Sequence, residues 1–166
     1  MTPDIVLPIS TPEGDFWARY TENGLAGIDF PGRRRAVRSH STPALPKRVK
    51  QWHLQATQAL KSVLSGRPFK TLPPLDWTEA TQFQQKVWRV MLSIPMGKTL
   101  AYGDVASRIG NPSACRAVGS ACGANPIPVL VPCHRILAGN GDLGGFSGGL
   151  QWKRRLLERE KVSFRE

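Results

Sequence analysis

A stretch rich in glycine and proline, Ser65–Pro74, interrupts the chain between two segments with different hydrophobic patterns. Such a stretch continues neither a helix nor a strand, because proline lacks an N–H donor and glycine favours turns. We therefore predict a linker here and two small domains, residues 1–70 and 71–166. The length of 166 residues allows either one core or two.

The first segment has the pattern of a small α+β domain. Phe16–Tyr20 and Leu25–Phe30 are predicted strands around Asn23-Gly24, a pair that favours a tight hairpin because both residues tolerate positive φ. Apolar residues recur at helical spacing between Val49 and Val63, which predicts a helix that ends before the linker. This half shows no catalytic constellation.

The second segment is predicted to be mostly helical. Asp76-Trp-Thr-Glu79 has the pattern of a capping box, and the apolar positions from Phe83 to Ile94 then form one helical face that Pro95 ends. The run Val129–Val131 predicts a short buried strand, and a basic last helix is expected from about Gly149 to Glu160. The fold class expected for the whole chain is α+β.

Two short helices in the second segment predict a helix-turn-helix. The first runs over about 102–109, Gly110-Asn-Pro112 forces a turn, and Ser113 can cap a second helix that extends to about Gly123. Helix-turn-helix motifs place their second helix in a DNA groove, but many helical hairpins never contact DNA. The motif alone therefore leaves DNA binding open.

The charge balance indicates a polyanionic partner. The formal net charge is +11 for 18.3 kDa, with basic runs at Arg33-Arg34-Arg35, in a predicted loop from Pro31 to Pro46, at Lys47-Arg48 and at Lys153-Arg154-Arg155. Nucleic acid is the polyanion that such an excess favours. The alternative is a basic surface that serves solubility alone.

Cysteine usage and hydropathy exclude several classes of protein. The three cysteines, Cys115, Cys122 and Cys133, form no CxxC pair, and no combination with the three histidines has a familiar zinc-ligand spacing, so no metal is expected. The apolar runs are too short to span a membrane, and the N-terminus lacks the pattern of a secretory signal. We expect a cytoplasmic protein, or a nuclear one in a eukaryote.

Cys133 is the candidate nucleophile, since it stands between Pro132 and His134 just after the apolar run. A cysteine must reach the thiolate state to react, and an adjacent base lowers the barrier. On extended chain, however, adjacent side chains point to opposite faces, so His134 needs a turn or a bridging water to assist. A buried inert cysteine is the alternative.

A longer pattern connects these features to a known family. Its parts are Pro95-Met-Gly-Lys-Thr-Leu-Ala-Tyr102-Gly-Asp-Val-Ala, Gly110-Asn-Pro-Ser-Ala-Cys-Arg116-Ala-Val-Gly, Asn125-Pro-Ile-Pro128, Pro132-Cys-His-Arg-Ile136 and Gly145-Phe-Ser-Gly-Gly149. With these motifs in this order, the segment Phe83–Val162 resembles the C-terminal domain of the O6-alkylguanine-DNA alkyltransferases, also called methylated-DNA–protein-cysteine methyltransferases. The N-terminal half resembles that family only in outline.

The resemblance implies a DNA-repair reaction. The alkyl group of O6-alkylguanine, and in some cases of O4-alkylthymine, is moved irreversibly onto one cysteine after the nucleotide has been flipped out of the duplex. The protein acts once and needs no cofactor. The implied partners are double-stranded DNA, bound through its minor groove, and the alkylated base; a monomer is expected in solution.

The resemblance also implies catalytic roles. Cys133 is the alkyl acceptor, and His134 and Glu160 form a water-mediated relay that removes the thiol proton. Asn125 braces the turn before the active site. Tyr102 helps to rotate the nucleotide and donates a proton to the departing guanine.

Further positions follow from the same motifs. Pro128, Ile136 and Ser147, together with Tyr102, are implied to bind the base. Arg116 is implied to fill the gap in the base stack, and Asn111 and Ala114 to lie against DNA.

Two departures from the family pattern stand out. No cysteine precedes Cys115, so the zinc site that some members hold in the N-terminal domain is absent, and Phe146 stands where others often have tyrosine. Retention of Cys133 argues against a related branch that binds alkylated DNA without repairing it.

Other readings remain open at this stage. The chain as a whole can be an alkylated-DNA-binding module without repair activity, a cysteine hydrolase, or a sensor that couples its own alkylation to transcription. Single residues have plainer roles as well. Glu160 can simply pair with a basic residue, Tyr102 can pack, Arg116 can contact a phosphate, Asn125 can form a turn, and Ser147 can be ordinary loop.

Overall fold

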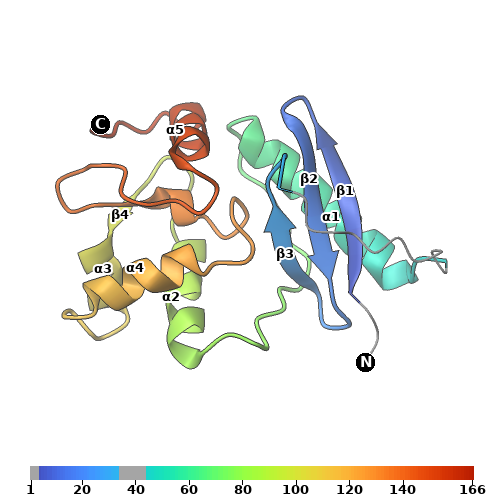
Figure 1. Cartoon of the computed structure of the whole chain (residues 1–166), viewed down its shortest axis with the longest axis horizontal. Coiled ribbons are helices and arrows are strands. Elements are labelled where there is room, and N and C mark those ends of the chain that lie inside the picture. The colour runs from blue at the N-terminus through green and yellow to red at the C-terminus, as the bar shows by residue number, and fades with distance from the viewer. Residues whose placement is uncertain (1–3, 34–43) are drawn as a thin grey trace.

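The computed structural model describes residues 4–33 and 44–166, and its N-terminal half is built around an antiparallel sheet. The sheet has the order β1-β2-β3, with β1 at Ile5–Thr11, β2 at Gly14–Tyr20 and β3 at Leu25–Asp29 (Figure 1). The predicted hairpin is confirmed as β2 and β3.

Strand β1 was not predicted. Its apolar residues Ile5, Leu7 and Ile9 alternate and pack against the core, with only Ile9 fully buried, and this pattern was overlooked in the sequence. It also contains Pro8, which has no N–H to donate and is tolerated because β1 lies at the edge of the sheet.

Helix α1, Lys47–Leu64, packs against the sheet as the sequence predicted. Val49, Ala56, Leu60 and Val63 lie on its buried face. The helix ends at Ser65, where Gly66 adopts a positive φ of 69°. Most of the loop predicted between residues 31 and 46 lies outside the described residues.

The linker prediction is correct in that residues 65–74 form neither helix nor strand. Its end is nevertheless tied to the sheet: the Leu25 N–H donates to the Pro74 carbonyl at 2.8 Å, and the Asp76 N–H donates to the Leu25 carbonyl at 2.8 Å. Gly24 is required at this contact, because a Cβ there would collide with the Pro74 carbonyl.

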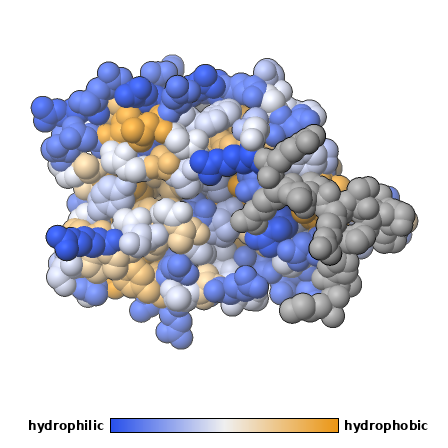
Figure 2. All heavy atoms as spheres, in the orientation of Figure 1, coloured by the Kyte–Doolittle hydropathy of each residue, from blue (hydrophilic) through white to orange (hydrophobic). Residues whose placement is uncertain are grey.

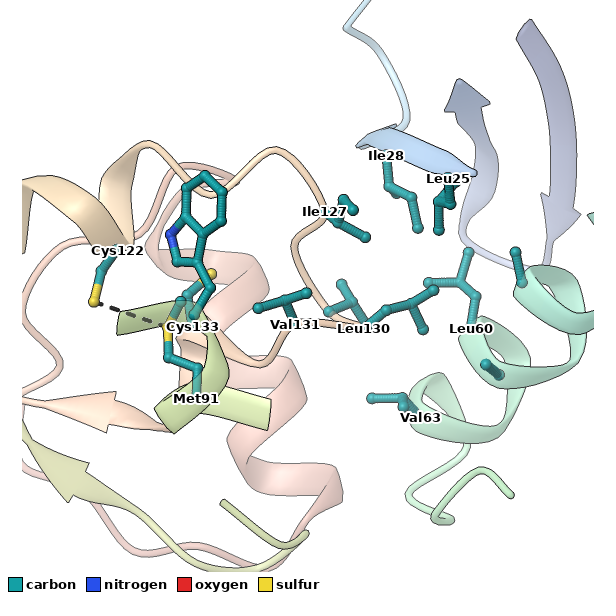
Figure 3. Packing of buried hydrophobic residues seen from close by; sticks show 14 of the residues in the cluster. Leu25, Ile28, Leu60, Val63, Met91, Cys122, Ile127, Leu130, Val131 and Cys133 are labelled. Carbon is teal, nitrogen blue, oxygen red and sulfur yellow. Dashed lines mark hydrogen bonds between the residues drawn. The ribbon is translucent and has the colours of Figure 1, made fainter. Parts of the chain in front are cut away.

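One hydrophobic cluster includes residues from both halves of the chain. Leu25 and Leu60 from the N-terminal half face Ile127 and Leu130 from the C-terminal half (Figure 3). The division into domains at residues 70 and 71 stays a prediction.

Helix α2, Gln82–Leu92, begins five residues later than predicted, because its N-cap is Thr81 and not Asp76. Its capping box is made by Thr81 and Gln84, each side chain accepting from the other residue's backbone N–H. The capping box predicted at Asp76–Glu79 is wrong. Asp76 instead accepts from the Thr78 N–H at 2.9 Å and from the Thr21 hydroxyl, so it stabilises a turn.

The helix-turn-helix geometry is present. Helix α3 spans Tyr102–Arg108 and helix α4 spans Cys115–Gly123. Ser113 does not cap α4, since its hydroxyl donates to the Asn111 side chain at 3.0 Å and Ala114 occupies the cap position. The last helix, α5, spans Leu150–Arg159 as predicted.

The strand predicted at Val129–Val131 is wrong. These residues are buried but form a turn in which Val129 has a φ of 74°, a left-handed conformation that interrupts extended chain. A short strand β4, Leu100–Ala101, instead pairs in parallel with β5, Ile136–Leu137. Periodicity cannot separate a fully buried turn from a buried strand, because every side chain is apolar in both.

The arrangement is α+β, as predicted, with the sheet and α1 beside the group formed by α2, α3, α4 and α5 (Figure 1). On the face that Figure 2 shows, hydrophilic side chains cover much of the periphery and apolar surface is confined to patches. None of the helices in the described ranges is both long and apolar enough to cross a membrane.

Candidate active site

Cys133 is the first residue of a single 3₁₀ turn, η1, Cys133–Arg135, which connects the buried 125–131 turn to β5. The side chain is only 5% exposed and lies near Met91 of α2 and Cys122 of α4 (Figure 3). Because the backbone turns here, the alternation of faces expected for extended chain does not apply to Cys133 and His134.

The thiol of Cys133 is protonated at rest. Burial raises its pKa to about 11, while the Asn125 side chain, the Lys153 ammonium and two backbone N–H groups act in the opposite direction. At neutral pH a free thiolate therefore costs about 5 kcal/mol, at 1.36 kcal/mol for each pH unit below the pKa. A base must take the proton for the sulfur to react.

His134 is fully buried and holds a fixed orientation. Its Nε2 lies 2.7 Å from Oε1 of Glu160. Burial raises the pKa of the Glu160 carboxyl, but hydrogen bonds from His134 and Arg135 outweigh that effect and bring it down to about 2. An ionised carboxylate only accepts, so Nε2 carries the ring proton and Nδ1 is the basic atom.

The other ring nitrogen of His134, Nδ1, can accept a proton. His134 Nδ1 is buried and has no hydrogen-bond partner among the described residues. Burial lowers the pKa of His134, and the contact with Glu160 opposes that shift without cancelling it, so the ring is neutral at pH 7 and can accept a proton.

Arg135 completes the buried cluster, and sequence reasoning missed it. Its Nε and one terminal nitrogen both donate to Glu160 at 2.9 Å, and its other terminal nitrogen donates to the Ile94 carbonyl at 2.7 Å. Glu160 is thus held by His134 and Arg135 together. The plainer reading of Glu160, a partner for a basic residue, describes one part of the same cluster.

Asn125 braces the buried turn before the active site. Its amide nitrogen donates to the Val131 carbonyl at 2.8 Å, and its amide oxygen accepts from the Ile127 N–H at 3.0 Å. The Ile28 N–H of β3 donates to the Pro126 carbonyl at 2.9 Å and fastens the same turn to the sheet.

A second residue that the sequence did not reveal, Lys153, holds the loop after β5. Its ammonium is fully buried and donates to the carbonyls of Ile136 at 2.6 Å and Gly145 at 3.1 Å, and to that of Leu143. Burial lowers the pKa of Lys153 to about 8. In the sequence this lysine is the first of three basic residues, which is the usual pattern of a solvated helix face.

Tyr102, the first residue of α3, faces that loop. A Cβ on Gly144, which has a positive φ of 67°, would lie 2.9 Å from the Tyr102 hydroxyl, so only glycine fits opposite it. The side chain is half-buried, and burial raises its pKa. The phenol therefore keeps its proton at neutral pH and can donate it.

Known proteins are similar to this chain in sequence and in fold. The family model "6-O-methylguanine DNA methyltransferase, DNA binding domain" matches residues 82–162. A methylated-DNA–protein-cysteine methyltransferase of Methanosarcina acetivorans is 35% identical over 150 residues, which cover 90% of this chain and 94% of the relative. The chain belongs to this methyltransferase family.

A second relative is more similar over a shorter stretch. The Mycobacterium tuberculosis H37Rv methyltransferase is 54% identical over 81 residues. That match spans about half of each protein, 49% of this chain and 49% of the relative.

Solved structures of similar proteins match the fold of this chain over almost its whole length. The crystal structure of Mycobacterium tuberculosis OGT in complex with DNA has a TM-score of 0.76 at 37% identity, covering 93% of this chain and 91% of that chain. The O6-methylguanine-DNA methyltransferase of Pyrococcus kodakaraensis strain KOD1 has a TM-score of 0.66 at 28% identity, covering 95% and 98%. The N-terminal half, which the sequence related to the methyltransferases only in outline, therefore shares their fold.

Two of the four base-binding positions of the methyltransferase pattern, Pro128 and Ser147, border one cavity, and Tyr102 and Ile136 are not in its lining. Asn125, Pro128 and Ser147 line a cavity of about 240 Å³ together with Phe30. Ile136 is fully buried, and its carbonyl accepts a hydrogen bond from the Lys153 ammonium.

The DNA-binding positions of the methyltransferase pattern lie apart from that cavity. Asn111 and Arg116 are exposed and Ala114 is partly exposed, all at the N-terminal end of α4. The structure thus separates a buried chemical centre from a surface that a large partner can reach. How these side chains act on DNA remains a prediction.

Proposed function

We propose that this chain repairs alkylated DNA by moving the alkyl group from O6 of guanine to Sγ of Cys133, once per molecule. The observation that carries the proposal is the buried cluster of Cys133, His134 and Glu160, in which the carboxylate fixes the histidine tautomer and leaves Nδ1 as a base. The names of the relatives support the same chemistry.

The proton of Cys133 passes to His134 Nδ1 through a water molecule, and Glu160 stabilises the imidazolium that forms. The Lys153 ammonium and the backbone N–H groups of η1 stabilise the thiolate. Even with these interactions the free thiolate costs about 5 kcal/mol at pH 7, so the proton leaves the sulfur only as His134 takes it.

The sulfur then forms a bond to the alkyl carbon while the carbon–oxygen bond to guanine breaks. The electron pair of that bond goes to the purine, which takes a proton from Tyr102, and the imidazolium proton returns through solvent to the tyrosine. The products are guanine and a thioether. A thioether is stable, so the protein is not regenerated and no cofactor is consumed.

Access to the thiol requires the base to leave the duplex. O6 of guanine is enclosed in stacked DNA, and Cys133 is buried, so the nucleotide flips into the protein at a cost of a few kcal/mol. Arg116 enters the vacated position from the minor groove and offsets part of that cost. O4-alkylthymine carries the same kind of alkyl ether and belongs to the same substrate class. One monomer serves one lesion.

Mass spectrometry of the intact protein tests the proposal. Incubation with a duplex containing O6-methylguanine should add one methyl group in place of a hydrogen, on Cys133, while an unmodified duplex adds nothing. The Cys133→Ala variant should bind DNA and gain no mass, whereas Cys115→Ala and Cys122→Ala should gain the methyl group. A wild-type protein that binds the lesion without a mass gain is a binding module, and one that releases alkyl product repeatedly is a hydrolase; either result refutes the transfer.

A further inference from the structure

Arg135 and His134 bind the same carboxylate. Oε1 of Glu160 lies 2.7 Å from His134 Nε2 and 2.9 Å from a terminal nitrogen of Arg135, and Oε2 lies 2.9 Å from Arg135 Nε. All three side chains are buried, so water screens their charges little. The single negative charge of Glu160 therefore faces a permanent cation, Arg135, and a ring that is charged only when it is protonated, His134.

The carboxylate that orients His134 also favours its protonated form. A negative charge within hydrogen-bond distance stabilises the imidazolium and raises the pKa of a histidine. An imidazolium carries a proton on both ring nitrogens, so Nδ1 of a protonated His134 could take none from the Cys133 thiol. If Glu160 acted on His134 without another charge beside it, orientation and basicity would conflict.

The charges around His134 resolve this conflict in favour of the neutral ring. The pKa of His134 lies below its ordinary value of 6.5: burial is the largest cause, Glu160 raises the pKa, and the positive charges of Arg135 and Lys153 lower it. Of these two cations, Arg135 is the one that donates to Glu160, whereas Lys153 donates to backbone carbonyls. Arg135 therefore acts on the imidazole and on the carboxylate that would charge it.

The surroundings of the ring come from three elements. The end of α5 provides Glu160 and its body provides Lys153, while η1 provides Arg135 and the titratable thiol of Cys133. After α2, the uncharged Ile94 carbonyl accepts from the remaining terminal nitrogen of Arg135 at 2.7 Å. This contact fixes the guanidinium plane, so that its fork binds both carboxylate oxygens, which the point charge of a lysine cannot do.

We propose that Arg135 is a positioning residue that keeps His134 unprotonated, and therefore available as the base, at neutral pH. Its guanidinium balances the charge of Glu160, so the carboxylate orients the imidazole without charging it. The inference rests on the proposed alkyl transfer, in which Nδ1 of His134 receives the thiol proton.

The pH dependence of transfer distinguishes charge balance from packing. Single-turnover rates are measured from about pH 5 to pH 9 with saturating duplex that carries O6-methylguanine, for wild type, Arg135→Gln and Arg135→Lys. The acid midpoint is the pH at which protonation of the base halves the rate. It should rise by about one pH unit or more in Arg135→Gln, which keeps a donor but loses the charge. Arg135→Lys keeps the charge and should stay within about half a unit of wild type.

Arg159→Gln is the matched control, because it removes a positive charge from the residue that precedes Glu160 in the chain. Arg159 pairs with Glu13 and its side chain is 32% exposed, so water screens its effect on the cluster. Its acid midpoint should equal that of wild type. Thermal unfolding confirms that each variant is folded. An unmoved midpoint in folded Arg135→Gln, or an equal rise in Arg159→Gln or Arg135→Lys, overturns the inference.

A measurement on the wild-type protein applies should Arg135→Gln fail to fold. An NMR titration of the His134 ring, with its signals assigned by comparison with His134→Gln, should give a midpoint below 6.5. A midpoint at or above 6.5 shows that Arg135 does not offset the Glu160 charge, and it overturns the inference. The titration does not depend on transfer, so absence of any methyl transfer by wild type refutes the proposed function and is a separate result.

Discussion

Replacing Glu160 with glutamine tests the buried cluster most directly. Glu160 is 6% exposed and accepts three hydrogen bonds, one from His134 and two from Arg135. Glutamine has nearly the same shape but offers only one acceptor oxygen. Its amide nitrogen therefore meets a donor, and the Arg135 guanidinium is left buried without a counter-charge.

The pKa of Glu160 gives the expected magnitude. Its displacement from 4.5 to about 2 corresponds to about 3 kcal/mol of extra stabilisation of the charged form, at 1.36 kcal/mol for each pKa unit. Breaking a buried ion pair by removing one partner costs about 3–5 kcal/mol, a range that includes the value obtained from the pKa of Glu160. We therefore expect Glu160→Gln to lower the free energy of unfolding at pH 7 by about 3–4 kcal/mol.

Urea unfolding at several pH values is the assay. Because folding lowers the pKa of Glu160, its stabilisation is complete above the unfolded value of 4.5 and is lost as the pH falls toward about 2. The unfolding free energies of wild type and variant should converge in that window. Methyl transfer at pH 7 should also slow by about 10²–10⁴-fold, since His134 loses its orienting carboxylate.

Glu13→Gln is the control for this prediction. Glu13 pairs with Arg159 at 2.8 Å, but its side chain is 19% exposed and that of Arg159 is 32% exposed. Partly solvated pairs contribute little, so the loss should stay below about 1 kcal/mol. The account of the cluster is refuted if Glu160→Gln lowers the free energy of unfolding by less than about 1 kcal/mol. It is also refuted if the difference in unfolding free energy between wild type and variant stays constant from pH 7 to pH 3.

Three further outcomes are expected. Arg116→Ala should lower the single-turnover rate at saturating duplex but leave transfer from free O6-benzylguanine unchanged, because the free base has no stack to disrupt; an unchanged duplex rate would exclude insertion of Arg116. Lys153→Met should lower the free energy of unfolding by about 3 kcal/mol in urea, because the carbonyls of Ile136, Leu143 and Gly145 lose their donor, and a loss below about 1 kcal/mol would contradict that role. A chelator should leave the rate of methyl transfer unchanged, since the described part of the chain contains no group of three metal-ligating side chains, and a loss that zinc restores would contradict this.

Local sequence patterns are sufficient to predict several elements of this fold. The β2–β3 hairpin, helix α1 and the pair α3 and α4 each follow from a short-range cause: an Asn-Gly turn, an apolar face at helical spacing, or a forced turn between two helices. Cys133 and His134 were identified from a compact motif. In these cases the residues that determine the structure are neighbours in the chain.

Local patterns failed where burial comes from distant residues. The turn at Val129 resembles a strand because both of its faces are covered. The capping box was misplaced because two stretches of similar composition, at Asp76 and Thr81, precede the same apolar face.

The sequence by itself determined the helices, the hairpin and the identity of the candidate acceptor, Cys133. Only the tertiary structure decided how that thiol is surrounded. Arg135 and Glu160 are 25 residues apart, and Lys153 reaches a carbonyl 17 residues away. A charged residue in a sequence is expected to be solvent-exposed, because the residues that pair with it in the interior are distant in the chain. Here these partners are brought together by the packing of α5 against η1, which no local periodicity encodes.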